Sequence, residues 1–123
     1  MIRALALVLL AGPALAQDIA VPSGLEVSFV EVILEPDTGF ARFRFLAPQL
    51  GSPGWGPEEI AGDLAWLCDA VALPALQKSD WGVSQIIVSI ADRPLAFGEI
   101  NPDAIQFFEG FGVATGACEW EPF

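Results

Sequence analysis

Two stretches near the start of the chain alternate apolar and polar residues as paired β-strands do. The alternation predicts strands over 25–35 and 40–47, and Pro36-Asp37-Thr38-Gly39 between them has the composition of a turn. Pairing Glu35 with Phe40 predicts one buried face and one solvent face. The apolar face would carry Leu34 together with Val30, Val32, Ala41, Phe43 and Phe45, and we expect the last five to be buried. The solvent face would carry Glu31 opposite Arg44, with Arg42 diagonal to Glu31 and Glu35.

An apolar stripe at helical spacing follows further along the chain. Residues 47–59 are rich in proline and glycine, which predicts a loop. The stripe then predicts the main helix over 60–71, with Leu73-Pro74 ending or kinking it. Its apolar positions are Ile60, Leu64, Leu67, Cys68 and Val71.

The second half of the chain begins with an apolar, β-branched run over 85–91, which predicts the central strand. Asn101 has the chemistry of an N-cap and precedes Pro102, so a short second helix is predicted there, ending by Gly110. Residues 111–114 and 117–121 then suggest a terminal hairpin. The elements together predict an α+β fold. It has a mostly antiparallel sheet of four to five strands, with the main helix packed on one face and the short second helix.

The first sixteen residues have the pattern of an export signal. Met1-Ile2-Arg3 is basic, residues 4–11 form an apolar segment too short to span a bilayer, and Ala14-Leu15-Ala16 fits a cleavage site. We therefore expect cleavage after Ala16, a single domain over 17–123, and a periplasmic or secreted protein. After cleavage, no stretch of sequence would be expected to span a membrane.

The mature chain would be strongly acidic. It would keep all 16 acidic residues, and its basic residues would be Arg42, Arg44, Lys78 and Arg93, which leaves a net charge of −12. Such a chain repels phosphates and anionic lipid, so nucleic acid is not an expected partner.

Cysteine and histidine content narrows the available chemistry. An exported chain with two cysteines is expected to form a disulfide. Cys68 lies on the helical stripe and Cys118 on the inward face of the last predicted strand, so the two should meet in the core. The chain has no histidine, which removes the usual imidazole base and the commonest transition-metal ligand. It also has no tyrosine, which removes another possible proton donor. We expect no cofactor and no metal site.

The loop after the predicted central strand collects polar side chains. Asp92 and Arg93 end the strand, while Asn101 and Asp103 start the predicted helix, so these residues have structural tasks. Glu99 has none. The alternative is a ligand site at Asp92, Arg93 and Glu99, for instance for calcium, which prefers oxygen ligands. No D-x-D-x-D-G pattern supports calcium.

Two tryptophans, Trp55 and Trp81, lie in predicted loops. Exposed indole rings beside carboxylates are typical of glycan-binding surfaces, and rings folded over the core edge are the alternative. Trp66 and Trp120 are expected in the core.

Two further charged sets have both a chemical and a structural interpretation. Glu58, Glu59 and Asp63 could serve acid–base chemistry, but acidic residues in a first helical turn already favour the helix dipole. Arg42 and Arg44 could bind an anion, but ion pairs with the cross-strand acids account for them more simply.

Four motifs together resemble a family of short exported alphaproteobacterial proteins with no assigned function. The motifs are LCDAVALPAL, IIVSIADRPLAFGE, PDAIQFFEGF and ACEWEPF. Proteins of this kind are sometimes labelled acetolactate synthase. A thiamine-diphosphate enzyme is several times longer and cytosolic, and it carries a Gly-Asp-Gly motif that this chain lacks. The resemblance implies no catalytic residues.

These observations predict a non-enzymatic periplasmic binding or protein-interaction module with an unknown envelope protein as partner. The alternative is a carbohydrate-active or glycan-binding envelope protein that uses loop tryptophans and carboxylates. A groove joining an exposed tryptophan to a carboxylate would favour the glycan, and a continuous exposed apolar patch would favour an interaction module.

Overall fold

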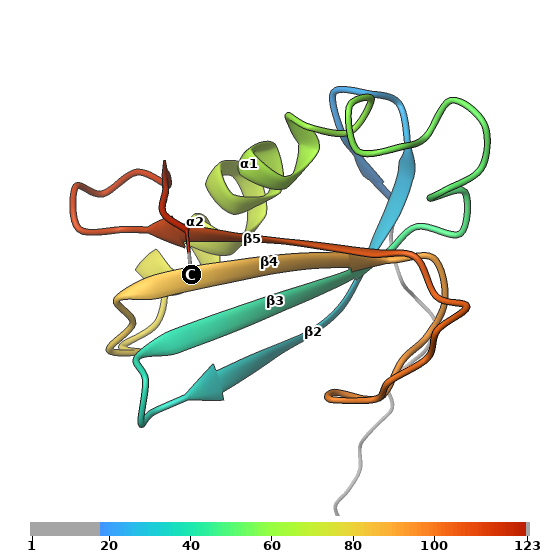
Figure 1. The fold of residues 1–123 in the computed structure, drawn as a ribbon. Coiled ribbons are helices and arrows are strands. Elements are labelled where there is room, and N and C mark those ends of the chain that lie inside the picture. The colour runs from blue at the N-terminus through green and yellow to red at the C-terminus, as the bar shows by residue number, and fades with distance from the viewer. Residues whose placement is uncertain (1–17, 123) are drawn as a thin grey trace, which may run out of the picture.

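A curled mixed sheet of six strands carries one helical segment on one of its faces (Figure 1). The computed structural model describes residues 18–122, so the predicted signal over 1–16 lies outside the described residues. The strands follow one another across the sheet in chain order. They are β1 (Asp18–Ala20), β2 (Glu26–Glu35), β3 (Phe40–Leu46), β4 (Gln85–Ala91), β5 (Gln106–Gly112) and β6 (Glu119–Trp120).

The β3–β4 pair is parallel and the other four pairs are antiparallel. Parallel neighbours need a crossover connection, and here it contains the loop over 47–59 and the helical segment. The helical segment lies over the sheet (Figure 1). The α+β class and the mostly antiparallel sheet agree with the prediction, while the number of strands and the details of the helices differ.

The register of the first hairpin is as predicted near the turn and changes further along. Glu35 pairs with Phe40 and Glu31 pairs with Arg44, but a bulge lies between Phe29 and Glu31. A bulge places two residues of one strand opposite one residue of its partner, so the faces change at that point. Phe29 instead pairs with Phe45, and Val30 is 48 % exposed. The prediction that Val30 is buried was therefore wrong.

The helical segment begins later and ends later than predicted. It comprises α1 (Asp63–Leu67), the π-helical segment η2 (Cys68–Ala72) and α2 (Leu73–Gln77). The predicted bounds of 60–71 were therefore wrong at both ends. Proline clashes with the turn before it and lacks an N–H group, and a wider π turn accommodates both effects. The Leu73 N–H donates to the Cys68 carbonyl, five residues back, so the chain continues through Pro74.

The second helix predicted after Asn101 is absent from the described residues. The Asn101 side chain accepts a hydrogen bond from the Asp103 N–H at 2.9 Å, which makes a turn rather than a helix. From Gln106 the chain forms β5, which pairs with β4 over its whole length. The local cap chemistry was outweighed by the pairing of an aromatic-rich segment with a buried strand. The terminal hairpin is present, with Phe111 opposite Trp120.

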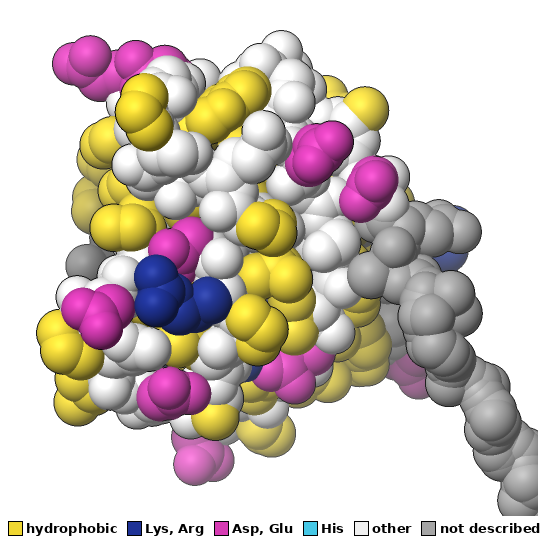
Figure 2. Space-filling model, turned by 90° about the vertical axis from the view of Figure 1, so that its right-hand side faces the viewer, with side chains coloured by type: hydrophobic (Ala, Val, Ile, Leu, Met, Phe, Trp, Pro, Cys, Tyr) yellow, Lys and Arg dark blue, Asp and Glu magenta, His cyan; other side chains and the backbone are white. Residues whose placement is uncertain are grey.

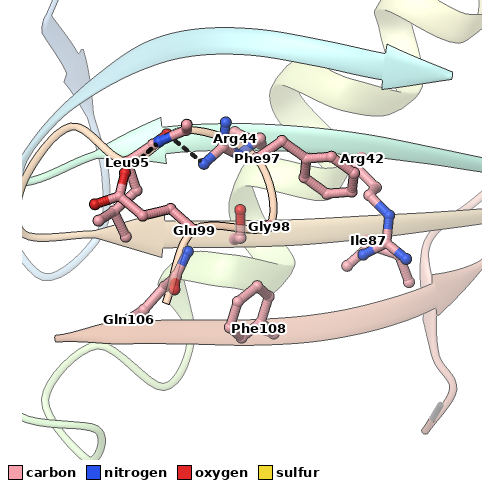
Figure 3. A pocket seen from close by; sticks show the side chains of 11 residues that line it. Arg42, Arg44, Ile87, Leu95, Phe97, Gly98, Glu99, Gln106 and Phe108 are labelled. Carbon is pink, nitrogen blue, oxygen red and sulfur yellow. Dashed lines mark hydrogen bonds between the residues drawn. The ribbon is translucent and has the colours of Figure 1, made fainter. Parts of the chain in front are cut away.

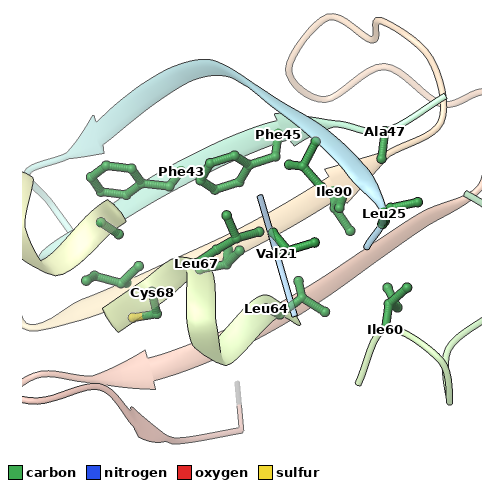
Figure 4. Close-up of a cluster of buried hydrophobic side chains, with 14 of the residues drawn as sticks. Val21, Leu25, Phe43, Phe45, Ala47, Ile60, Leu64, Leu67, Cys68 and Ile90 are labelled. Atoms are coloured by element: carbon green, nitrogen blue, oxygen red, sulfur yellow. The ribbon is translucent and has the colours of Figure 1, made fainter. Parts of the chain in front are cut away.

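The core lies between the helical segment and the sheet (Figure 4). Ile60, Leu64, Leu67 and Cys68 of the predicted stripe are buried there. No helix among residues 18–122 combines the length and the apolar character needed to cross a membrane.

The predicted disulfide between Cys68 and Cys118 is present, with the two Cα atoms 6.1 Å apart. Asp69 strengthens the same connection, because its Oδ1 accepts a hydrogen bond from the Cys118 N–H at 3.1 Å. The disulfide and this hydrogen bond tie the last hairpin to the helical segment.

The prediction that Trp66 and Trp120 lie in the core was wrong. They are 37 % and 66 % exposed. The Trp120 indole N–H instead donates to Glu109 Oε1 at 2.5 Å on the neighbouring strand.

Candidate functional site

The sheet face opposite the helical segment is partly covered by the loop over 92–105 (Figure 1). Between loop and sheet lie two hollows, of about 190 Å³ and about 310 Å³. They share Arg44, Ser89, Leu95 and Gln106, and we call them together the arginine groove. The first hollow is also lined by Arg42, Ile87, Ala96, Phe97, Gly98, Glu99 and Phe108. The second is also lined by Ser28, Phe29, Val30, Phe45, Leu46, Ala91, Arg93 and Pro94.

Strand register brings the floor of the groove together. Arg44 lies opposite Ser89, which lies opposite Phe108, so one row crosses three strands. Arg42 lies opposite Ile87 in the row beside it. Successive side chains of a strand alternate between faces, so these rows face away from the core side chains.

Arg44 joins the floor of the groove to its roof (Figure 3). Its Nη2 donates to the Leu95 carbonyl at 2.8 Å, and its Nη1 donates to Glu31 Oε2. The residue is only 9 % exposed, so the prediction that Arg44 faces solvent was wrong. The strand pattern identified its face correctly, but the loop over 92–105 covers that face.

Arg42 is less completely paired than Arg44. Its Nε lies 3.1 Å from Glu35 Oε1, yet the approach lacks hydrogen-bond geometry. The buried Nε is therefore paired with Glu35 by charge, without a hydrogen bond to any residue among 18–122. The guanidinium lies 5.5 Å from the centroid of the Phe97 ring and 5.8 Å from that of Phe40, both within cation–π range. Phe97 also lies 5.8 Å from the guanidinium of Arg44, so its ring contacts both arginines.

Polar and apolar groups line the groove side by side. The Ser89 hydroxyl and the Gln106 amide face it from neighbouring strands, and Glu99 faces it from the roof. Glu99 Oε1 accepts the Ala96 N–H at 2.9 Å, which closes the tip of the loop. Phe97 and Phe108 are 53 % and 48 % exposed, so apolar surface remains open to solvent around these polar groups.

The predicted site residues Asp92 and Arg93 hold the shape of the loop. Asp92 accepts two hydrogen bonds from Arg93, at 3.0 and 2.9 Å, and one from the Ile105 N–H at 3.0 Å. Arg93 also donates to the Asp103 carbonyl at 2.9 Å. Their mutual hydrogen bonds lower the pKa of Asp92 and raise the pKa of Arg93. In this loop the structure brings Arg93 and Glu99 to the groove, one at each hollow.

On the side of the molecule drawn in Figure 2, the most visible basic surface is one small patch. Acidic side chains surround that patch, with apolar ones between them. The charge around this patch is therefore mixed, in a chain whose net charge is −11.

The structure does not bring Trp55 and Trp81 to the arginine groove. Trp55 is half-buried and packs against the core. Trp81 is 37 % exposed and lines a separate hollow of about 200 Å³ with Glu35 and Phe40.

The three helix-proximal carboxylates also have structural partners. Asp63 is 1 % exposed and accepts hydrogen bonds from the Ser23 N–H at 3.1 Å and the Ser23 hydroxyl at 2.5 Å. Glu59 accepts the Gly56 N–H at 2.9 Å, and Glu58 is exposed. Among residues 18–122, no three Cys, Asp or Glu side chains gather in a way that could hold a metal ion.

Sequence reasoning missed Ser89, Phe97, Gln106 and Phe108 as lining residues. The only available signal was the alternation of the 85–91 run, which places Ile87 and Ser89 on one face. Phe108 was assigned to a helix, so its strand neighbours could not be identified.

Comparison with known proteins gives a match at the level of the family. Neither the curated proteins nor the solved structures provide a match to this chain. Residues 5–123 match a family of unknown function, DUF6497. The chain therefore belongs to that family of unknown function.

Proposed function

We propose that this protein is an exported, non-enzymatic binding domain whose small-molecule ligand lies in the arginine groove. One observation carries the proposal: the Arg42 guanidinium, paired with Glu35 through its Nε, lines the first hollow 5.5 Å from the centroid of the half-exposed Phe97 ring. Ligand sites typically combine apolar walls with a few convergent polar groups. A ligand oxygen could accept a hydrogen bond from the guanidinium while apolar ligand atoms cover the Phe97 ring.

The available side chains support binding rather than catalysis. The chain has no histidine or tyrosine, and both cysteines are bonded to each other. The lowered pKa of Asp92 and the raised pKa of Arg93 hold both groups in their charged forms. A general acid or base needs a pKa near the working pH, whereas the pKa values of Asp92 and Arg93 are shifted away from it.

Export is supported by the amino-terminal pattern and by the disulfide. A basic start, a short apolar segment and Ala14-Leu15-Ala16 are typical of a cleaved signal. Disulfides persist mainly in oxidising compartments, such as the bacterial periplasm. The ligand would then be a molecule of the cell envelope or of the surrounding medium.

The proposal is tested by titrating the mature protein with a set of small apolar fragments and following backbone amide shifts by NMR. We expect the largest shifts in residues 95–99 and 87–89. Phe97→Ala should weaken binding at least several-fold because it removes the roof ring. Ile100→Ala is the matched control, since this residue of the same loop is 93 % exposed and does not line the groove. Shifts confined to other surfaces would overturn the proposal.

Glycan binding is a second candidate because Trp81 and Glu35 line one hollow. Stacking on an exposed indole ring and hydrogen bonding to a carboxylate would suit a sugar. Titration with envelope-derived oligosaccharides, read by tryptophan fluorescence, tests it. Trp81→Ala should abolish the response, while Trp120→Ala, the change of another exposed tryptophan, should leave the affinity unchanged. Equal affinities of the wild type and Trp81→Ala would exclude this candidate.

A further inference from the structure

We infer that the arginine groove selects ligands that carry a carboxylate on a short apolar chain, with Arg42 binding the carboxylate. This inference rests on the proposed function and adds the chemical class of the ligand. It follows from three features of the groove: the pairing state of its arginines, the placement of its apolar side chains, and the position of Glu99.

Among the three arginines around the groove, Arg42 has the most unused donors. Arg44 donates to Glu31 and to the Leu95 carbonyl. Arg93 donates twice to Asp92 and once to the Asp103 carbonyl. Arg42 makes an ion pair with Glu35, but no hydrogen bond to it or to another residue among 18–122 is present.

A guanidinium binds a carboxylate through two parallel N–H groups, and such charge-assisted pairs are stronger than neutral hydrogen bonds. Contacts also restrain the Arg42 guanidinium: the ring centroids of Phe97 and Phe40 lie 5.5 and 5.8 Å from it, and its Nε pairs with Glu35. A fixed guanidinium loses less entropy on binding than a mobile one. Arg42 should therefore lose less entropy on binding a carboxylate than a solvated surface arginine would.

Apolar side chains lie next to the Arg42 guanidinium. Figure 3 shows Arg42 beside Ile87, with Phe97 above it and Phe108 on the neighbouring strand. All of them line the first hollow, whose volume of about 190 Å³ suits a short chain. A ligand tail here would cover Phe97 and Phe108, the two rings that are about half exposed.

Glu99 sets the direction of the ligand. In Figure 3 it lies toward Leu95 and Gln106, away from the end of the hollow that Arg42 occupies. A carboxylate near Glu99 would be repelled with no cation to offset it, whereas at Arg42 the guanidinium offsets the repulsion from Glu35. The head group therefore belongs at Arg42, and the tail points toward Gln106.

The test compares hexanoate, hexan-1-ol and hexylamine, which share one apolar chain and differ in head group. Dissociation constants are measured by NMR titration with the mature protein and three variants: Arg42→Gln, Glu99→Gln and the control Lys78→Gln. Lys78 is exposed and lines neither hollow, so the control removes one positive charge away from the groove. We expect hexanoate to bind about tenfold or more tightly than hexan-1-ol, as a charge-assisted hydrogen bond implies. The preference for hexanoate should vanish in Arg42→Gln and persist in Lys78→Gln. Glu99→Gln should strengthen hexanoate binding, a gain that misfolding does not produce.

The outcomes separate the inference from the proposed function. Equal binding of the three ligands in the groove, or a preference for hexylamine, overturns the carboxylate selectivity and leaves the groove as the ligand site. Retention of the hexanoate preference by Arg42→Gln overturns the role of Arg42. If none of the three ligands shifts a resonance of a groove residue, both the inference and the proposed function are overturned.

Discussion

Arg44 donates a hydrogen bond from Nη2 to the main-chain carbonyl of Leu95, 51 residues further along the chain, at 2.8 Å. This bond connects a strand in the middle of the sheet to the loop that covers it. Because Arg44 is nearly buried, the bond is protected from water and fixes the height of the roof above the floor.

Replacing Arg44 should therefore lower the free energy of unfolding by more than the loss of a surface ion pair does. Arg44→Ala leaves the Leu95 carbonyl and the Glu31 carboxylate without their partner, and breaking a buried pair costs about 3–5 kcal/mol. Because Glu31 is partly exposed, we expect about 3 kcal/mol by urea unfolding. A loss below about 1 kcal/mol would instead mean that the pair behaves as a solvated one.

The bulge in β2 gives a second prediction about stability. Phe43 is 2 % exposed, so Phe43→Ala should cost about 3–5 kcal/mol through lost burial and a cavity. Val30 protrudes at the bulge, so Val30→Ala should change stability by less than about 0.5 kcal/mol. Denaturant unfolding of both variants measures the difference. A loss of several kcal/mol in Val30→Ala would instead mean that Val30 is buried, as in a hairpin without the bulge.

The Asp92–Arg93 pair predicts that the stability of the folded protein decreases at low pH. The pKa of Asp92 is lowered in the folded protein, chiefly by its hydrogen bond to Arg93, so the ionised form favours folding. Its contribution is complete above the usual aspartate value of 3.8 and is lost as the pH falls through the folded pKa. Asp92→Asn should thus narrow the gap in melting temperature between pH 6 and pH 3. An unchanged gap would contradict this account.

Reduction of the disulfide between Cys68 and Cys118 should destabilise the protein. The bond closes a loop with a sequence separation of 50, which corresponds to about 4 kcal/mol in the chain-entropy model. Thermal unfolding with and without reductant measures the effect. Because Asp69 still binds the Cys118 N–H, the hairpin over 111–121 should exchange its amides faster without detaching fully. An unchanged melting temperature after verified reduction would oppose this prediction.

Export predicts a specific amino terminus for the native protein. Cleavage after Ala16 would leave Gln17, or its cyclised form, as the first residue. Mass spectrometry of protein from the periplasmic fraction reads this directly. An intact Met1 in that fraction would contradict cleavage.

Local patterns predicted the parts of this fold that local chemistry decides. The turn at 36–39 and the pairing of Glu35 with Phe40 follow from residues close in sequence. The meeting of Cys68 with Cys118 was predicted from the apolar stripe that carries Cys68, although Cys118 precedes β6, and Trp120, which was expected to share its inward face, is exposed. In these places propensity, pattern and packing favour the same structure.

The rest depended on contacts between distant segments. Asn101 and Pro102 have helix-start chemistry, yet the following residues pair with β4, a choice that no local window contains. The burial of Arg44 required the loop over 92–105 to fold back across β3. The candidate site was missed in part for the same reason, since Arg42, Phe97 and Phe108 meet only once β3, β4 and β5 are neighbours.

The arginine groove is tested most directly by a crystal structure of the mature protein with 6-bromohexanoate, because the anomalous signal of bromine locates the tail independently of the carboxylate. We predict a carboxylate within about 3 Å of the Arg42 guanidinium, the distance of a charge-assisted hydrogen bond. The bromine peak should lie in the first hollow beside Phe97 and Phe108, toward Gln106. A bromine peak in the Trp81 hollow, or a carboxylate bound at Arg93 with Arg42 unoccupied, would contradict the account.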